Sequence, residues 1–205
     1  MTGINCTGII LAGGKSLRMG EEKGLVNFEG KPMIEHAISF LEPLVSNIII
    51  SSNSDKYNYL SKLIVKDHIL NCGPGAGIVA ALNKSTTDVN IIVPCDMPHL
   101  NREFMEYILS KRGDFEAIVP VLKSEPEPLC VVMKKKCAIS IKAELEKGVY
   151  KLSDIYRSLD VNYLEISGDE PGYKSNLFNN YNSSADMDSQ SNNLSSILKI
   201  NSDRL

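Results

Sequence analysis

A glycine-rich, basic stretch from Leu11 to Gly20 contains the residues of this chain best suited to chemistry. It follows the apolar run Ile9-Ile10-Leu11 and places Lys15 and Arg18 next to two adjacent glycines, with Lys23 shortly after. Glycine lets the main chain approach an anion, and backbone N–H groups together with cationic side chains neutralise it. The stretch therefore predicts a polyphosphate-binding loop, with a basic surface loop as the alternative.

Two better-known phosphate-binding motifs do not fit this stretch. The P-loop requires a glycine five positions before Gly14, where this chain has Ile9. Gly8 lies one residue too early, and the residues between form the predicted strand. The dinucleotide-binding fingerprint also fails, because the pair Gly13-Gly14 lacks a third glycine at the required spacing. The chain therefore carries a different kind of glycine loop.

Asp96 is the second position with a clear chemical role. It follows the apolar run Asn90–Pro94 and lies in the sequence Pro94-Cys95-Asp96-Met97-Pro98, where the prolines stiffen the backbone. A carboxylate fixed there can bind Mg²⁺, which takes oxygen ligands and keeps water and phosphate oxygens in its shell. An aspartate that only caps the turn is the alternative. Cys95 is interpreted as packing at the strand end.

The three cations of the loop suit different positions along a polyphosphate. Arg18 offers a planar fork of donors for phosphate oxygens, whereas Lys15 and Lys23 each supply a mobile point charge. A cation at the α-phosphate would stabilise the charge that grows there during nucleophilic attack. Chemistry alone therefore leaves Lys15, Arg18 and Lys23 open for this role, with Asp96 as the candidate metal ligand.

Alternating strand and helix patterns must position these groups. Apolar runs predict buried strands, and apolar residues at helical spacing predict helices between them. The strands are expected near residues 9–11, 47–51, 63–65, 90–94, 117–121, 129–133 and 161–166, and the helices near 32–41, 57–63, 78–82, 101–111 and 152–156. This order predicts an α/β fold, a three-layer, doubly wound, mostly parallel sheet with helices on both faces.

Ligands bind such sheets outside the carboxyl ends of the strands. Residues 13–23, Asn53, residues 67–77 and Asp96 are therefore expected along one edge. The second glycine-rich stretch, Gly73-Pro74-Gly75-Ala76-Gly77, is expected to form a loop at this edge.

Length and composition restrict the remaining possibilities. With 205 residues and a net charge of −3, the chain suits one α/β domain and argues against a nucleic-acid-binding face. Five scattered cysteines without a C-x-x-C pair indicate reduced thiols, and the three histidines, without metal-ligand spacing, are interpreted as structural. Without a leader or a membrane-spanning run, a cytoplasmic protein with no membrane partner is expected. We predict one domain over residues 1–205, with a loosely ordered Asn/Ser-rich tail from about residue 183.

The stretch from Leu11 to Lys23 resembles a known signature. Leu-Ala-Gly-Gly-x-Ser-x-Arg-Met-Gly-x-x-Lys is similar to the motif of the molybdenum cofactor guanylyltransferases, within the wider class of nucleotidyltransferases. The resemblance extends to about Asp186 and implies a Rossmann-like nucleotidyltransferase fold. It also implies a Mg²⁺-dependent enzyme that transfers GMP from GTP to molybdenum-bearing molybdopterin and releases pyrophosphate. Pterin-delivery proteins and the molybdoenzymes that accept the product would be its protein partners.

The resemblance further implies a set of nucleotide-binding residues: Leu11, Ala12, Gly13, Gly14, Lys15, Lys23, Asn53, Asp67 and Asp96. Lys23 matches the family's nucleotide-binding lysine, and Asp96 matches the aspartate that binds both metal and nucleotide. Arg18 would reach the leaving phosphates, and the resemblance implies Arg18, Lys23 and Asp96 as the catalytic residues. Asn53 and Asp67 match positions that contact the nucleoside, although each is also a common turn residue.

The residues implied on the acceptor side are Gly75, Gly77, Asn180 and Asn182. The glycines match the family's Gly-Pro-x-Ala-Gly loop, for which a plain strand-to-helix turn is the alternative. Residues 125–129 resemble a substrate-side hairpin. Residues 178–182 resemble the segment Phe-x-Asn-x-Asn, but the following Ser183-Ser184-Ala185-Asp186 departs from the usual Thr-Pro-Glu-Asp.

Two other functions stay open on the sequence. One is transfer of CMP to the same pterin, or of a nucleotide to another phosphorylated acceptor. The other is a non-catalytic GTP-binding sensor, against which Lys23 and Asp96 argue because a sensor can bind without fixing metal at the α-phosphate. Gly13 favours guanine, since the cytidylyl relatives tend to carry alanine there and a Cβ would crowd a purine ring.

Overall fold

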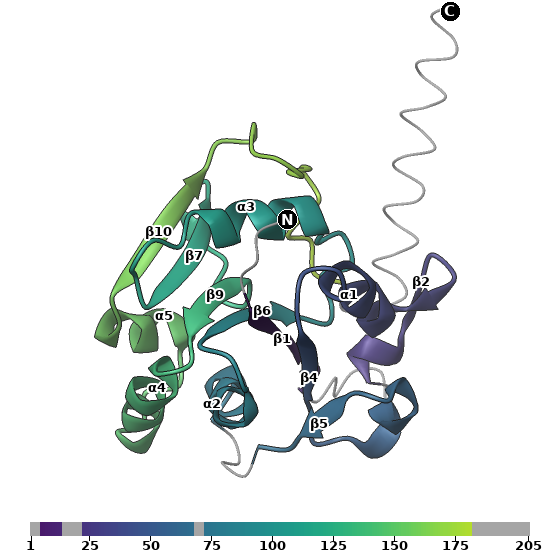
Figure 1. Ribbon diagram of the computed structural model, residues 1–205, viewed down its shortest axis with the longest axis horizontal. Helices are drawn as coiled ribbons and strands as arrows, with labels where there is room; N and C mark the ends of the chain where they lie inside the picture. Colours follow the sequence, from purple (N-terminus) through teal and green to yellow (C-terminus); the bar gives the residue numbers. More distant parts are fainter. Residues whose placement is uncertain (1–4, 14–21, 68–71, 182–205) are drawn as a thin grey trace, which may run out of the picture.

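An eight-stranded sheet forms the centre of the structure, a computed structural model that describes residues 5–13, 22–67 and 72–181 (Figure 1). Its strands are β1 (Cys6–Leu11), β4 (Asn47–Ser51), β5 (Leu63–Val65), β6 (Val89–Pro94), β7 (Ala117–Leu122), β8 (Glu125–Pro126), β9 (Val131–Lys134) and β10 (Val161–Ile166). They follow the order β10-β7-β9-β6-β1-β4-β5, and β8 pairs with β7. Strand β9 is antiparallel to both neighbours and β8 to β7, whereas the other pairs are parallel.

Strand β1 lies inside the sheet between β4 and β6, and all six of its residues are buried. It is parallel to both neighbours, with Ile9 opposite Ile49 on one side and opposite Ile92 on the other. A strand covered on both faces has no solvent side, which explains why its second half, Ile9–Leu11, is apolar without alternation. The buried Thr7 hydroxyl is paired with that of Thr87 (2.8 Å).

Helices cover both faces of the sheet (Figure 1). They are α1 (Met33–Leu41), α2 (Pro74–Lys84), α3 (Arg102–Ser110), α4 (Cys137–Glu146) and α5 (Leu152–Ile155), with the 3₁₀ helices η1 (Lys23–Leu25), η2 (Asp55–Leu60) and η3 (Tyr156–Ser158). Successive β1 residues point to opposite faces, so Ile9 and Leu11 pack with α2, α4 and α5, whereas Ile10 packs with α1 and α3. The predicted three-layer, mostly parallel α/β fold is confirmed.

Helix α2 begins earlier than predicted, at Pro74. Proline fits the first helical position, where its missing N–H would have no intrahelical partner. Gly75 and Gly77 are therefore helical and buried, and the expected loop over residues 73–77 is wrong. A Cβ on Gly75 would lie 3.3 Å from the Leu145 side chain, and one on Gly77 would lie 2.6 Å from Ser51 Oγ. Close packing explains both glycines, whose low helix propensity suggested a loop.

The sequence did not predict α4, the short antiparallel hairpin of β2 (Asn27–Phe28) and β3 (Lys31–Pro32), or the short 3₁₀ helix η1. In α4, Ile139 is 76% exposed and obscures the apolar stripe that faces the core. The helix expected near residues 57–63 is the 3₁₀ helix η2, which has a shorter period than an α-helix.

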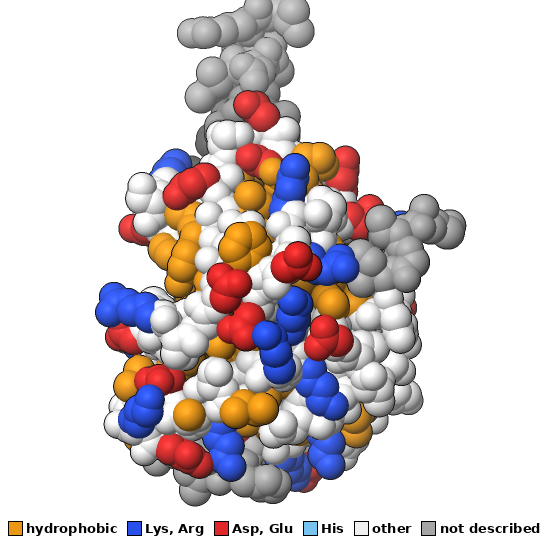
Figure 2. Space-filling view, turned by 60° about the vertical axis from the view of Figure 1, so that its left-hand side comes forward, with side chains coloured by type: hydrophobic (Ala, Val, Ile, Leu, Met, Phe, Trp, Pro, Cys, Tyr) orange, Lys and Arg blue, Asp and Glu red, His pale blue; other side chains and the backbone are white. Residues whose placement is uncertain are grey.

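The surface and the cysteines agree with the composition. Basic and acidic side chains are interspersed on the face shown in Figure 2. All five cysteines are free and buried, as predicted for reduced thiols. Within the described ranges, no helix is long and apolar enough to cross a membrane. The predicted tail and His68 lie outside these ranges.

Asn101 connects helix α3 to the segment that follows β10. Its Oδ1 accepts a hydrogen bond from the Phe104 N–H (3.0 Å), which caps the helix as predicted, and its Nδ2 donates to the Gly172 carbonyl (2.7 Å). Phe104 also packs edge-on against Phe178, with ring centroids 5.5 Å apart. The C-terminal part of the described chain is therefore fixed to the element that follows Asp96.

Two substitutions of Asn101 should weaken this connection to different extents. Asn101→Ala loses the cap and the bond to Gly172, at about 2 kcal/mol, and should lower Tm by about 4–8 °C. Asn101→Ser keeps a capping oxygen and loses the donor to Gly172, so its Tm should fall by about half as much. Thermal unfolding followed by circular dichroism measures both shifts. A Tm of wild-type value for Asn101→Ala would contradict the connecting role.

Candidate active site

The carboxyl ends of four adjacent strands form one edge of the sheet. Strands β6, β1, β4 and β5 are neighbours and parallel, so their ends lie side by side. The Ala12 N–H donates to the Ser51 carbonyl (2.9 Å), and the Cys95 N–H donates to the Leu11 carbonyl (3.1 Å). The pairing thus continues past the strand ends and fixes the residues that follow them, Gly13 and Asp96.

Lys23 and Asp96 form an ion pair at this edge. The Lys23 ammonium lies 3.3 Å from Asp96 Oδ2, and the two side chains are 33% and 14% exposed. Lys23 opens η1, whereas Asp96 follows β6, so two distant parts of the chain contribute the pair. Water screens partly buried charges less than exposed ones, so their attraction is stronger than that of a surface pair. Two of the three predicted catalytic residues are therefore in contact.

Asn53 and Asp67 form a second polar pair. Asn53 Nδ2 donates to Asp67 Oδ1 (2.8 Å). Asn53 follows β4 and Asp67 follows β5, so the pair lies at the same edge as Asp96. Its exposure leaves the pair accessible to a ligand.

Of the predicted nucleotide-binding residues Leu11, Ala12 and Gly13, only Gly13 is exposed. Leu11 and Ala12 are 8% and 4% exposed, and their side chains pack in the core. The Ala12 carbonyl also accepts a hydrogen bond from Ser52 Oγ (3.2 Å). A Cβ on Gly13 would have a single close neighbour among the described atoms, the Ser51 carbonyl oxygen at 3.9 Å, so the described part of the chain leaves the space beside Gly13 open. Backbone contact at Gly13 is therefore available to a ligand.

The acceptor-side residues fall into three groups. Gly75 and Gly77 lie inside the first turns of α2, and a Cβ on either residue would point into packed neighbouring side chains. Asn180 is exposed and precedes Tyr181, whose N–H donates to the Asp96 carbonyl (3.0 Å). Asn182 lies outside the described residues, as do the predicted nucleotide-loop residues Gly14, Lys15 and Arg18.

An aromatic cluster that the sequence did not predict supports this contact of Tyr181 with Asp96. Phe28 lies at the centre, 5.4 Å from His36, 5.2 Å from His99 and 5.0 Å from Tyr181 between ring centroids. His99 Nε2 and the Tyr181 hydroxyl are 2.8 Å apart, and burial lowers the pKa of His99, so the ring is neutral at neutral pH. The two histidines are structural, as predicted. No local pattern connects residues this far apart in sequence.

The Cys95 thiol is not a candidate nucleophile. The side chain is buried, and burial raises its pKa, with the neighbouring Asp96 carboxylate raising it further. The thiol therefore stays protonated and fills space, as predicted, because the thiolate is the reactive form.

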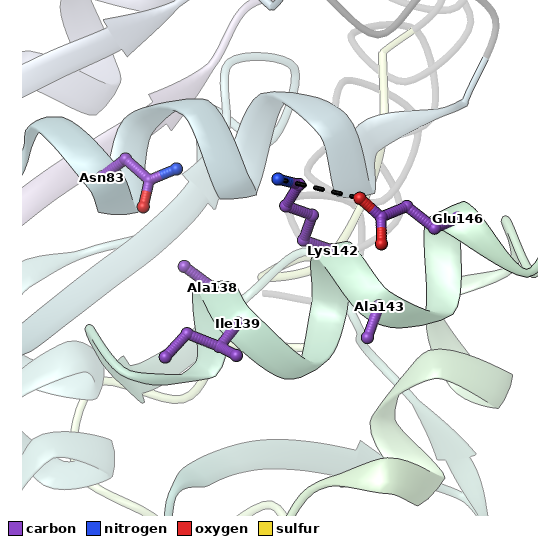
Figure 3. Close-up of a pocket in the computed structure, with 6 residues that line it drawn as sticks. All are labelled: Asn83, Ala138, Ile139, Lys142, Ala143 and Glu146. Atoms are coloured by element: carbon purple, nitrogen blue, oxygen red, sulfur yellow. Dashed lines mark ion pairs between the residues drawn. The ribbon is translucent and has the colours of Figure 1, made fainter.

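A surface depression between α2 and α4 lies apart from these residues (Figure 3). It encloses about 420 Å³, and Ile139, Lys142 and Glu146 lie along α4 with Asn83 facing them from α2. Lys142 and Glu146 form an ion pair of 3.7 Å. None of the candidate residues lines this depression.

Among the described residues, no group of three or more His, Cys, Asp or Glu side chains could hold a metal ion. Asp96 instead fits an ion that takes only one ligand from the protein. The Asp96 carboxylate, whose Oδ2 contacts Lys23, is a single hard ligand, which suits Mg²⁺ because this ion is often held by one carboxylate together with water and substrate phosphates.

Comparison with known proteins identifies the family. Residues 8–162 match the MobA-like NTP transferase domain. The chain is 36% identical over 173 residues to a probable molybdenum cofactor guanylyltransferase of Flavobacterium johnsoniae, which covers 83% of this chain and 90% of that protein. It is 34% identical over 154 residues to the molybdenum cofactor guanylyltransferase of Shewanella sp. strain MR-4, which covers 72% and 78%.

A solved structure supports the fold independently. The crystal structure of molybdopterin-guanine dinucleotide biosynthesis protein A from Archaeoglobus fulgidus matches with a TM-score of 0.75 at 23% identity, over 93% of this chain and 99% of that one. The family match includes the end of β1, the Lys23–Asp96 pair and the Asn53–Asp67 pair. The chain that forms this edge therefore belongs to the MobA-like NTP transferases.

Proposed function

We propose that this protein transfers GMP from GTP to molybdopterin that carries molybdenum, with release of pyrophosphate. The observation that carries the proposal is the Lys23–Asp96 pair (3.3 Å) at the carboxyl edge of the sheet, where open α/β sheets bind ligands. The printed names of the Flavobacterium and Shewanella relatives support the choice of guanylyl transfer.

The reaction is an in-line displacement at the α-phosphorus. A terminal phosphate oxygen of the pterin attacks, the bond between the α-phosphorus and its bridging oxygen to the β-phosphate breaks, and pyrophosphate leaves. Lys23 neutralises the charge that grows on the α-phosphate oxygens. Because the attacking phosphate is already an anion, it needs no general base, and catalysis rests on positioning and charge neutralisation.

Asp96 would hold Mg²⁺ through its carboxylate. When bound, this ion supplies positive charge against the phosphate oxygens. The single carboxylate suits a cation that arrives with the nucleotide, because phosphate and water then complete its oxygen shell. Asp96 also links both substrates, since its backbone carbonyl accepts from Tyr181, next to Asn180.

Recognition of the nucleoside is assigned to the exposed polar groups of β1, β4 and β5. The Asn53–Asp67 pair presents an amide and a carboxylate in fixed orientation, which suits hydroxyl and N–H groups of a nucleoside. Gly13 leaves space for a flat base beside its backbone. On the acceptor side, we keep Asn180 as a candidate pterin-binding residue. Gly75 and Gly77 could contribute only backbone groups. The cytoplasm as the site of action, and delivery or acceptor proteins as partners, remain predictions.

Release of pyrophosphate tests this proposal directly. The purified protein with GTP, Mg²⁺ and molybdenum-bearing molybdopterin should release pyrophosphate, and omission of the pterin should abolish release. CTP in place of GTP should be a poorer donor, whereas a sensor would bind GTP without release. Preference for CTP would contradict guanylyl transfer, and release without pterin would contradict the assigned acceptor.

Asp96→Asn should fold normally and lose most turnover. The amide keeps the shape of the carboxylate but is a neutral, poorer ligand, and the loss of metal-assisted stabilisation should cost about 3–4 kcal/mol, or about a hundredfold to a thousandfold in kcat. Asp88→Asn is the matched control, because Asp88 is an exposed carboxylate directly before the opposite end of β6. Steady-state kinetics over a Mg²⁺ series measures the effect. Wild-type turnover at saturating Mg²⁺ would exclude Asp96 as the metal ligand.

Gly13→Ala should narrow the preference for GTP over CTP. The described residues leave room for the added methyl group, so Tm should stay at its wild-type value. The methyl group should instead crowd the guanine ring of bound GTP. A misfit of this kind changes discrimination by about 1–3 kcal/mol, expressed mainly as a lower kcat/KM for GTP. Measuring kcat/KM for both nucleotides in both proteins decides the point. An unchanged ratio would remove Gly13 from base recognition and leave guanylyl transfer intact.

A further inference from the structure

Tyr57 packs against the backbone that carries the Lys23–Asp96 pair. Its side chain, on η2, is fully buried in the same core cluster as Cys95. A Cβ built on Gly24 would lie 2.9 Å from the Tyr57 hydroxyl and 3.3 Å from Cys95 Sγ. Gly24 follows Lys23 directly, and Cys95 directly precedes Asp96. The hydroxyl therefore occupies the narrow space where these two segments meet.

Among the described residues, the Tyr57 hydroxyl makes no well-aligned hydrogen bond, and its polar contact is with the Gly24 backbone. A buried hydroxyl with so weak a contact adds little stability, and phenylalanine would fill nearly the same space. The oxygen atom therefore contributes to the position of the Gly24 backbone more than to stability. Tyr156 offers the contrast: it is equally buried, but its hydroxyl donates to the Pro128 carbonyl (2.8 Å).

We propose that Tyr57 is a positioning residue for the transfer reaction, whose hydroxyl sets the separation between the Lys23 and Asp96 segments. The inference rests on the proposed function of that pair. Without the oxygen atom, the backbone at Gly24 can move toward the ring, and the Lys23 ammonium moves with it. A displacement of this size matters because electrostatic stabilisation depends on the position of the charge at the reacting phosphate.

Tyr57→Phe tests the positioning role against a packing role. Its Tm should equal that of the wild type or exceed it by about 2–4 °C, while kcat falls about tenfold and KM for GTP changes less than about twofold. Tyr156→Phe is the matched control, with Tm lower by about 2–4 °C and kcat within about twofold of wild type. A packing residue would instead lose stability and turnover together.

Two double variants test whether Tyr57 acts on turnover through Lys23 and through the backbone at Gly24. In a Lys23→Ala background, Tyr57→Phe should change kcat by less than about twofold, because Tyr57 acts through Lys23. Gly24→Ala should lower Tm in the wild type, and the loss should be smaller in a Tyr57→Phe background, where the oxygen atom at 2.9 Å is absent. This second comparison requires no turnover.

The outcomes separate this inference from the proposed function. Wild-type protein without GTP-dependent pyrophosphate release would overturn the proposed function. Active wild type together with unchanged kcat in Tyr57→Phe would overturn only the positioning role. Multiplicative losses in the Lys23→Ala background, or additive Tm losses for Gly24→Ala and Tyr57→Phe, would also overturn it.

Discussion

The parallel pairing of β1 with β4 and β6 is the constraint on which the candidate site depends. It aligns three carboxyl ends and continues beyond them through the hydrogen bonds from Ala12 to Ser51 and from Cys95 to Leu11. Since alternate residues of β1 pack on opposite faces, a shift of one residue would exchange Ile9 for Ile10 between two cores. The core therefore fixes the register, and the register fixes where Gly13 and Asp96 leave the sheet.

The Lys23–Asp96 pair stabilises a charge arrangement that a nucleotide and its cation can replace. A carboxylate that is only 14% exposed would be costly without a positive partner, and Lys23 supplies one in the free protein. A phosphate could replace Asp96 as the partner of Lys23, and a divalent ion could replace Lys23 as the partner of Asp96. Opposite charges would then still be adjacent.

The sequence was sufficient for the fold class and for the groups that follow strand ends. Apolar runs such as the one in β1 are strong signals because burial on both faces demands them, and Lys23 and Asp96 were expected at one edge for the same topological reason. Gly75 and Gly77 were misassigned to a loop because their small size serves tertiary packing, which overrides helix propensity. Tyr57 was missed because its contacts join segments far apart in the chain.

The two halves of the site are built by different means. In the proposed site, the nucleotide side would consist of strand ends. The proposed acceptor side would depend on a segment without regular structure, which contacts the Asp96 carbonyl through the Tyr181 N–H. His99 contacts the Tyr181 hydroxyl (2.8 Å). Burial lowers the pKa of His99, so its ring brings no positive charge to the loop that carries Asp96. A neutral imidazole orients the tyrosine through this contact and adds no positive charge to the loop. The irregular segment is thus held in place without altering the charge of the Lys23–Asp96 pair.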